Sequence, residues 1–219
     1  MTAPPARPAA IVFDWDNTLV DTWPTIHDAL TVTFEAMGRR PWSLAETKAR
    51  VRHSLRDSFP GLFGDRWAEA RDIFYKAFER SHIERLVPIA GAAELLAALS
   101  AAGIDMAVLS NKTGRYLRDE VAHLEWQGYF AATVGAGDAE RDKPARQSLE
   151  LALGPLDCKP GESVWIVGDS GIDLEIAHRT GCVPILMHRR DLDADEFAEW
   201  PPQIVFSGCN SLKELIARW

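Results

Sequence analysis

The sequence predicts an α/β protein with a three-layer parallel-sheet core and a small all-helical insertion after the first strand. From residue 88 onward, short apolar runs alternate with helical stretches, and such βαβ units build parallel sheets. Before this alternation, residues 22–87 show helical periodicity and no convincing strand. We therefore expect a core formed by residues 1–21 and 88–219 and a helical cap formed by residues 22–87.

Length and composition are consistent with this architecture and narrow the function. The 219 residues are 47% hydrophobic, which is enough for a sizeable core, and the net charge of -8 disfavours a nucleic-acid partner, because phosphate backbones are held by clusters of Lys and Arg. Three cysteines without CxxC spacing give little support for a disulfide framework or a zinc site. No apolar run has the length of a signal peptide or a membrane span. We expect a cytoplasmic monomer or homodimer whose ligand is a small molecule.

The first predicted strand ends in two carboxylates. Asp14 and Asp16 follow the apolar run 11–13, and side chains alternate along a strand, so both acids project to the same side. A single acid here is more often a turn former or a helix cap. Two crowded acids, however, repel and raise each other's pKa, which calls for a cation between them. This pair therefore indicates a Mg²⁺-assisted site.

The insertion contains three predicted helical stretches. The first has apolar residues at helical spacing and ends near Gly38, the second begins with a capping box at 43–46, and the third follows Asp65. Between the last two, residues 58–64 contain Pro60 and two glycines. We expect a break there, in a loop that dips toward the core.

The most basic cluster of the insertion lies at residues 50–56. We expect Arg52 and Arg56 to bind a second anionic group of the ligand, such as a carboxylate. The alternative is a solvated helix face.

The core then alternates between helices and strands. In order, we expect a helix at 91–101, a strand at 104–109, a helix at 114–124, a strand at 131–134, a helix at 145–153, a strand at 164–167, a helix at 172–180 and a strand at 183–187.

Polar residues follow three of these strands. Ser110 and Asn111 come after the strand at 104–109, where a hydroxyl and the backbone N–H groups of a starting helix would hold phosphate oxygens. Lys143 and Pro144 open the helix after the strand at 131–134.

Two more carboxylates follow the strand at 164–167. Asp169 and Asp173 lie at a turn and a helix start, four residues apart. Because ligands bind at the carboxyl ends of parallel strands, we expect these residues to converge with Asp14 and Asp16.

Four motifs, DWDNTLVD, LSN, KP and GDSGID, stand in the order found in the haloacid dehalogenase superfamily. Over nearly its whole length the chain resembles the phosphatase branch of that superfamily, and within it phosphoglycolate-phosphatase-like enzymes. The resemblance implies a Rossmann-like core with a helical cap and a Mg²⁺-dependent phosphatase. Its substrate would be a small phosphorylated metabolite, with phosphoglycolate as the leading candidate. Where the family usually has Gly after the second Asp, this chain has Asn17, which tolerates turn and left-handed geometry.

The resemblance also implies the chemical roles. Asp14 is the nucleophile that forms an aspartyl-phosphate, and Asp16 protonates the leaving group and then activates water. Lys143 neutralises the phosphate together with Asp14, and Ser110 and Asn111 bind phosphate oxygens.

The implied Mg²⁺ ligands are the carboxylates of Asp14 and Asp169 and the backbone carbonyl of Asp16. For Asp173 the resemblance suggests that it holds either a metal-bound water or Lys143. Four carboxylates, Lys143 and one Mg²⁺ sum to about -1 before a phosphate dianion arrives. We therefore predict that Asp16 is protonated in the substrate complex.

Three alternatives remain at this point. A sugar-phosphate mutase would need a histidine where Ile26 stands, and His27 lies one residue late; a phosphonatase-like enzyme would need a cap lysine, for which Lys48 and Lys76 are the candidates. A catalytically silent binding protein could also use this fold. The intact set of acids together with Lys143 argues against the silent protein.

Overall fold

The computed structural model describes residues 6–51, 53–187 and 196–218. Its centre is a six-stranded, fully parallel sheet in the order β5-β4-β1-β6-β7-β8. The strands are β1 (Ala10–Phe13), β4 (Asp105–Thr113), β5 (Ala132–Ala136), β6 (Val164–Gly168), β7 (Val183–Met187) and β8 (Ile204–Phe206). β1 lies between β4 and β6, so the carboxyl ends of these three strands meet at one edge of the sheet.

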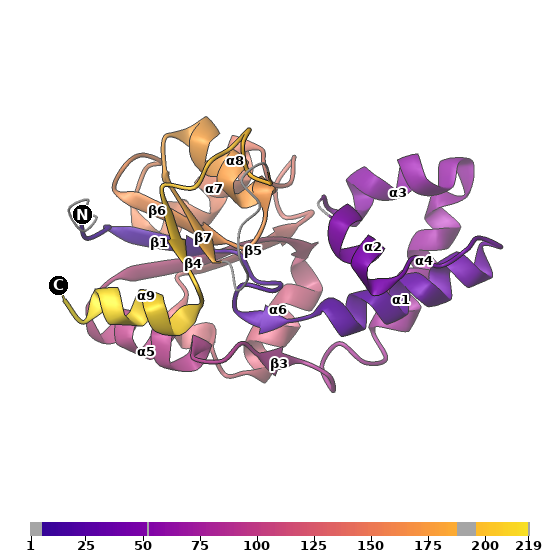
Figure 1. Ribbon diagram of the computed structural model, residues 1–219, viewed down its shortest axis with the longest axis horizontal. Helices are drawn as coiled ribbons and strands as arrows, with labels where there is room; N and C mark the ends of the chain where they lie inside the picture. Colours follow the sequence, from indigo (N-terminus) through magenta and orange to yellow (C-terminus); the bar gives the residue numbers. More distant parts are fainter. Residues whose placement is uncertain (1–5, 52, 188–195, 219) are drawn as a thin grey trace.

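Helices cover both faces of the sheet (Figure 1). One face carries α5 (Ala92–Ala101), α6 (Gly114–His123) and α9 (Cys209–Ile216), and the other carries α7 (Arg146–Leu153) and α8 (Gly171–Thr180). The alternation of side chains along β1 supplies both layers, because Ile11 and Phe13 pack into the first core and Ala10 and Val12 into the second. The predicted α/β fold class is confirmed.

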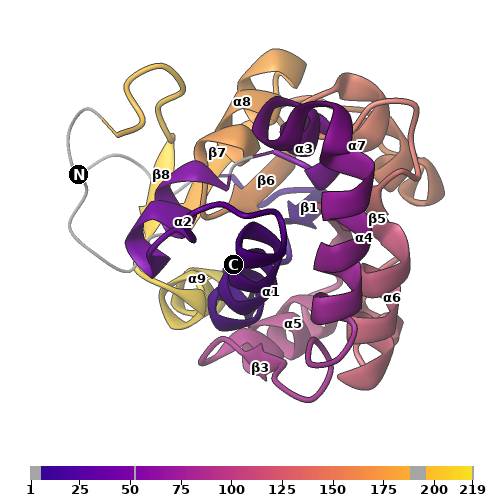
Figure 2. The same ribbon diagram turned by 90° about the vertical axis from the view of Figure 1, so that its right-hand side faces the viewer.

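Four helices form a separate lobe over one end of the sheet (Figures 1 and 2). They are α1 (Trp23–Ala36), α2 (Leu44–Arg50), α3 (Leu55–Phe63) and α4 (Trp67–Phe78), with a short 3₁₀ turn at Gly64–Arg66. Leu30, Phe34, Phe59 and Phe63 are among the buried residues of the lobe's own apolar core. We refer to this lobe as the cap.

The cap is joined to the core by a short antiparallel pair that the sequence did not predict. β2 (Val20–Asp21) pairs with β3 (Val87–Pro88), which brings the two ends of the insertion together. The domain boundaries themselves stay a prediction.

The capping box at the start of α2 is confirmed, because the Ser43 hydroxyl accepts a hydrogen bond from the Glu46 N–H and the Glu46 carboxylate accepts one from the Ser43 N–H.

The predicted break at 58–64 was wrong, since α3 continues through Pro60 to Phe63. The chain turns only at Gly64, whose φ of 58° is in the left-handed region. Burial of Phe59 and Phe63 in the cap core favours the helix over the predicted loop.

In the core, each predicted helix and strand is present, and the ends agree within two residues except at β4, which continues four residues beyond the predicted end at 109. Two elements were not predicted from the sequence: β8, which extends the sheet, and α9, which packs beside α5 on one face. Among the described helices, none has the length and apolar character needed to cross a membrane. The cytoplasmic location stays a prediction.

Candidate active site

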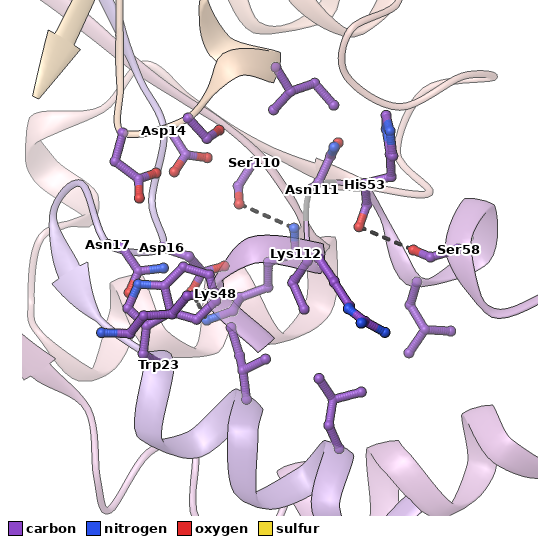
Figure 3. A pocket seen from close by; sticks show the side chains of 18 of the residues that line it. Asp14, Asp16, Asn17, Trp23, Lys48, His53, Ser58, Ser110, Asn111 and Lys112 are labelled. Atoms are coloured by element: carbon purple, nitrogen blue, oxygen red, sulfur yellow. Dashed lines mark hydrogen bonds and ion pairs between the residues drawn. The ribbon is translucent and has the colours of Figure 1, made fainter. Parts of the chain in front are cut away.

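The loops that follow β1, β4, β5 and β6 converge below the cap, at a cavity of about 490 Å³. The core side of the cavity is lined by predicted site residues, namely Asp14, Asp16, Ser110, Asn111, Lys143 and Asp169. Figure 3 shows Asp14 facing Ser110, with Asp16 and Asn17 beside them. The structure thus brings together side chains that are up to 155 positions apart in the chain (residues 14 to 169).

Lys143 is the centre of this arrangement. Its Nζ lies 2.7 Å from Oδ1 of Asp14 and 2.6 Å from Oδ1 of Asp173, and it donates a third hydrogen bond of 3.0 Å to the Leu109 carbonyl oxygen. Burial alone would lower the pKa of the ammonium, but the two carboxylates outweigh burial and raise it. Lys143 is therefore a fixed positive charge next to Asp14.

Asp173 is held from both sides. It is the third residue of α8, and its Oδ2 accepts hydrogen bonds from the N–H and the hydroxyl of Ser170, which is the N-cap residue. Its other oxygen faces Lys143. A carboxylate with both oxygens engaged in this way suits the orientation of Lys143 better than direct contact with a ligand.

Asp14, Asp169 and Asp173 place one carboxylate oxygen each within 4.8 Å of one another. Burial is the main cause that raises the pKa of Asp14 to about 7; Lys143 opposes this rise and neighbouring carboxylates add to it. Burial and then the charge of Asp14 raise the pKa of Asp169 well above its usual value. Hard oxygen donors crowded in this way fit a small divalent cation such as Mg²⁺, which would relieve their repulsion.

Ser110 and Asn111 lie at the end of β4, where its pairing with β5 shifts register after Leu109. The Ser110 hydroxyl is buried and accepts a hydrogen bond of 3.1 Å from the Lys112 N–H. Asn111 donates a bond of 3.1 Å to the Lys143 carbonyl oxygen. Both residues line the cavity, as Asp14 does. Because the Ser110 hydroxyl accepts its hydrogen bond from Lys112, its own proton is available to an anion.

Asn17 has the geometry that the sequence suggested. Its φ of 65° is in the left-handed region, which Asn tolerates more readily than most residues. The replacement of the usual Gly therefore leaves the turn after the two acids intact.

The sequence analysis missed one group that lies beside Asp16. Nζ of Lys112 is 2.7 Å from Oδ1 of Asp16 and 2.6 Å from Oε2 of Glu120, which lies on α6. Burial would lower the pKa of Lys112, but the two carboxylates raise it above its usual value. In the sequence, Lys112 stands directly after the LSN motif, and nothing in the neighbouring residues indicates that it is buried.

Sequence comparison assigns the family. A sequence profile of the haloacid dehalogenase-like hydrolases matches residues 11–187. The chain is a haloacid dehalogenase-like hydrolase. It is 27% identical over 215 residues to a phosphoglycolate phosphatase of Pseudomonas fluorescens. The aligned region covers 94% of this chain and 78% of the relative. It is also 27% identical over 172 residues to a phosphoglycolate phosphatase of Aquifex aeolicus, with 78% of this chain and 80% of the relative covered.

Solved structures show the same architecture for this haloacid dehalogenase-like hydrolase. A hydrolase of that superfamily from Ehrlichia chaffeensis is 28% identical and superposes with a TM-score of 0.64, covering 97% of both chains. A haloacid dehalogenase-like family protein from Streptococcus pneumoniae superposes with a TM-score of 0.81 at 23% identity, covering 95% of this chain and 97% of that one. The second likeness concerns the fold alone.

The cap of this haloacid dehalogenase-like hydrolase differs from the prediction in its basic residues. Arg52 lies outside the described residues. Arg56 does not line the cavity and instead forms a two-pronged ion pair with Asp142, at 2.5 and 2.6 Å. Asp142 comes directly before Lys143, so Arg56 links the cap to the loop that carries Lys143. Two other residues of that basic cluster, Arg50 and His53, do line the cavity, as does Lys48.

Proposed function

We propose that this protein is a Mg²⁺-dependent phosphomonoester hydrolase that works through an aspartyl-phosphate on Asp14. The observation that carries the proposal is the position of the Lys143 ammonium between Asp14 and Asp173, beside the carboxylate of Asp169. The carboxylate of Asp14 thus lies beside a positive charge and beside oxygens that can bind a cation. This environment suits its attack on the phosphorus of a phosphate ester.

In the first step, an oxygen of Asp14 attacks phosphorus and the bond from phosphorus to the leaving oxygen breaks. Asp16, protonated in the substrate complex, gives its proton to that oxygen. Asp16 then takes a proton from water, whose oxygen attacks phosphorus, and the bond from phosphorus to the Asp14 oxygen breaks. Inorganic phosphate leaves, Asp14 regains its carboxylate, and Asp16 is protonated for the next cycle.

Lys143 and Ser110 would bind phosphoryl oxygens of the substrate. The carboxylates of Asp14 and Asp169 and the backbone carbonyl of Asp16 would hold Mg²⁺, whose charge stabilises the phosphoryl oxygens. Asp173 orients Lys143 rather than the metal, because both of its oxygens already have protein partners.

Phosphoglycolate is the leading candidate substrate. The relatives named phosphoglycolate phosphatase support it, at about one quarter sequence identity. In the cap, Lys48 lines the cavity and stacks over the Trp23 ring, with no ion pair to a described carboxylate. From this position on the cavity wall it would meet a second anionic group of the substrate.

The geometry weakens the mutase alternative and leaves one candidate lysine for the phosphonatase-like alternative. A mutase would need a histidine from soon after the first motif to reach the cavity, whereas His27 hydrogen-bonds with Thr47 within the cap and does not line the cavity. Of the two lysines considered for a phosphonatase-like imine, only Lys48 lines the cavity.

The test is turnover of p-nitrophenyl phosphate with Mg²⁺, with EDTA, and in an Asp14→Asn variant, followed by a panel of phosphoglycolate, pyrophosphate, nucleotides and sugar phosphates. We expect turnover that needs both Mg²⁺ and Asp14, and a preference for phosphoglycolate. No turnover of any ester in the presence of Mg²⁺ would favour a silent binding protein.

A further inference from the structure

A buried polar network joins Asp16 to the core and reaches the cavity wall at Lys112. Its hub is Glu120, whose carboxylate is completely buried on α6. One oxygen accepts a hydrogen bond of 2.7 Å from Nε1 of Trp15 and lies 2.6 Å from Nζ of Lys112, and the other lies 3.0 Å from Nδ1 of His82. Three segments of the core and the return from the cap therefore meet at one carboxylate.

Lys112 connects this hub to the cavity. Its side chain is only 5% exposed, and its ammonium spans Glu120 and Asp16, whose side chain is 17% exposed and lines the cavity. Nζ also lies 5.4 Å from the centre of the Phe78 ring, at the end of α4. The ammonium, on the wall of the cavity, is therefore held between its two carboxylates.

We propose that Lys112, anchored by Glu120, is a positioning residue that sets the direction of the Asp16 carboxylate for proton transfer. The proposal rests on the proposed role of Asp16 as general acid and base. Asp16 follows β1 in a turn, where its side chain has rotational freedom unless something holds it. The described ion pair of Asp16 is the one with Lys112. A carboxylate that must serve first the leaving oxygen and then water needs its oxygens within hydrogen-bond reach of both.

Stability alone is a poor reason for this network. Burying an ion pair usually gains little over a well-packed apolar substitute, because desolvation offsets the attraction. Glu120 already has Trp15 and His82 as partners without Lys112, yet Lys112 also pairs with Asp16 at the wall of the cavity. The arrangement is therefore best explained by what it does to Asp16.

The test uses two esters that differ in their need for an acid. p-Nitrophenyl phosphate has a good leaving group and needs little proton transfer, whereas an alkyl phosphate needs a proton on its leaving oxygen. In Lys112→Met, we expect kcat/KM for the alkyl phosphate to fall about 100-fold and kcat/KM for p-nitrophenyl phosphate to fall less than about 3-fold. The reason is that a misdirected Asp16 slows only a reaction that needs proton transfer to the leaving oxygen. Lys159→Met, at an exposed lysine outside the cavity, is the matched control and should change neither value.

A double-mutant cycle separates positioning from a general structural effect. If Lys112 acts through Asp16, adding Lys112→Met to Asp16→Asn should cost no further activity toward the alkyl phosphate. Glu120→Gln, which keeps the size of the hub but weakens its hold on Lys112, is the second variant and should show the same leaving-group signature at smaller size. Urea unfolding checks that each variant is folded.

Equal losses on both esters, or a further loss in the Asp16→Asn background, would overturn the positioning role while leaving the phosphatase function intact. Absence of turnover by the unmodified protein would overturn the proposed function and this inference with it. The two failures are therefore distinguishable.

Discussion

Nζ of Lys143 lies 2.7 Å from Oδ1 of Asp14, in a pocket where both side chains are almost completely buried. The two residues are 129 positions apart and come from the loops after β5 and β1. This contact gives the proposed nucleophile a permanent counter-charge. It is also the contact that a phosphate group would share on entering the site.

Loss of this counter-charge should abolish most of the activity. In Lys143→Met we expect kcat to fall about 10²- to 10³-fold, because a preorganised charge at the phosphoryl oxygens is lost. Steady-state turnover of p-nitrophenyl phosphate measures this, and Lys159→Met is the control. Full kcat in a folded Lys143→Met protein would contradict the role given to Lys143.

Mg²⁺ affinity should depend on pH through the raised pKa of Asp14. The pKa of about 7 means that below this value Asp14 carries a proton that Mg²⁺ must displace. The affinity for Mg²⁺ should therefore be greatest above about pH 7. Below that pH it should fall by up to about tenfold per pH unit for each proton that Mg²⁺ displaces. Calorimetric titration of Mg²⁺ in buffers of different ionisation enthalpy reports both the affinity and the protons released. The same affinity at pH 5.5 and 8 would show that the acids are ionised without the metal.

Gly168 tests the placement of Asp173. A Cβ atom at this position would lie 2.1 Å from Cγ of Asp173. Gly168→Ala should therefore push Asp173 away from Lys143, lower kcat, and reduce the free energy of unfolding by about 1–3 kcal/mol. Gly161→Ala, where a Cβ meets nothing within 4 Å, is the matched control. Equal behaviour of the two variants in urea unfolding and turnover would speak against the close contact.

Arg56 should stabilise the protein rather than bind substrate directly. Its partner Asp142 has a side chain that is 1% exposed, so Arg56→Ala leaves a buried carboxylate with the Gly137 N–H as its remaining described donor. We expect the free energy of unfolding to drop by about 1–3 kcal/mol. Arg146→Ala removes the exposed pair with Glu150 and should cost at most about 0.5 kcal/mol. If Arg56→Ala raises KM for phosphoglycolate tenfold without loss of stability, the original substrate-binding prediction is right.

The proposed acid should matter in proportion to the leaving group. Asp16→Asn should slow aspartyl-phosphate formation from an alkyl phosphate by about 10²- to 10⁴-fold, because proton transfer to the leaving oxygen is lost. Rapid-quench measurement of the phosphorylated protein checks this step by itself. Formation at the full rate from such a poor leaving group would remove Asp16 from the role of acid.

The fold and the core of the site could be predicted because their signals are local. Short apolar runs that end in polar residues predict the strands and the edge of the sheet at which Asp14, Ser110 and Asp169 lie. Parallel strands bring their carboxyl ends together at that edge independently of the conformation of the loops. The capping box of α2 was predictable for the same reason, since its two partners are three residues apart.

What the sequence did not predict depends on which distant residues become neighbours. Pro60 and two glycines suggested a loop, but packing of Phe59 and Phe63 in the cap favoured a helix. Arg56 was assigned to substrate on charge alone, and its partner Asp142 is 86 positions away.

The sequence by itself therefore determined most strands of the main sheet, the acids at their ends and the family to which the chain belongs. Only the tertiary structure decided that Lys112 is buried between Asp16 and Glu120 instead of lying in solvent. The physical reason is that the environment of a charged side chain is set by long-range packing, which local spacing does not encode. Here α6 supplies Glu120, the loop after β1 supplies Asp16, and the ammonium of Lys112 lies over the Phe78 ring at the end of α4.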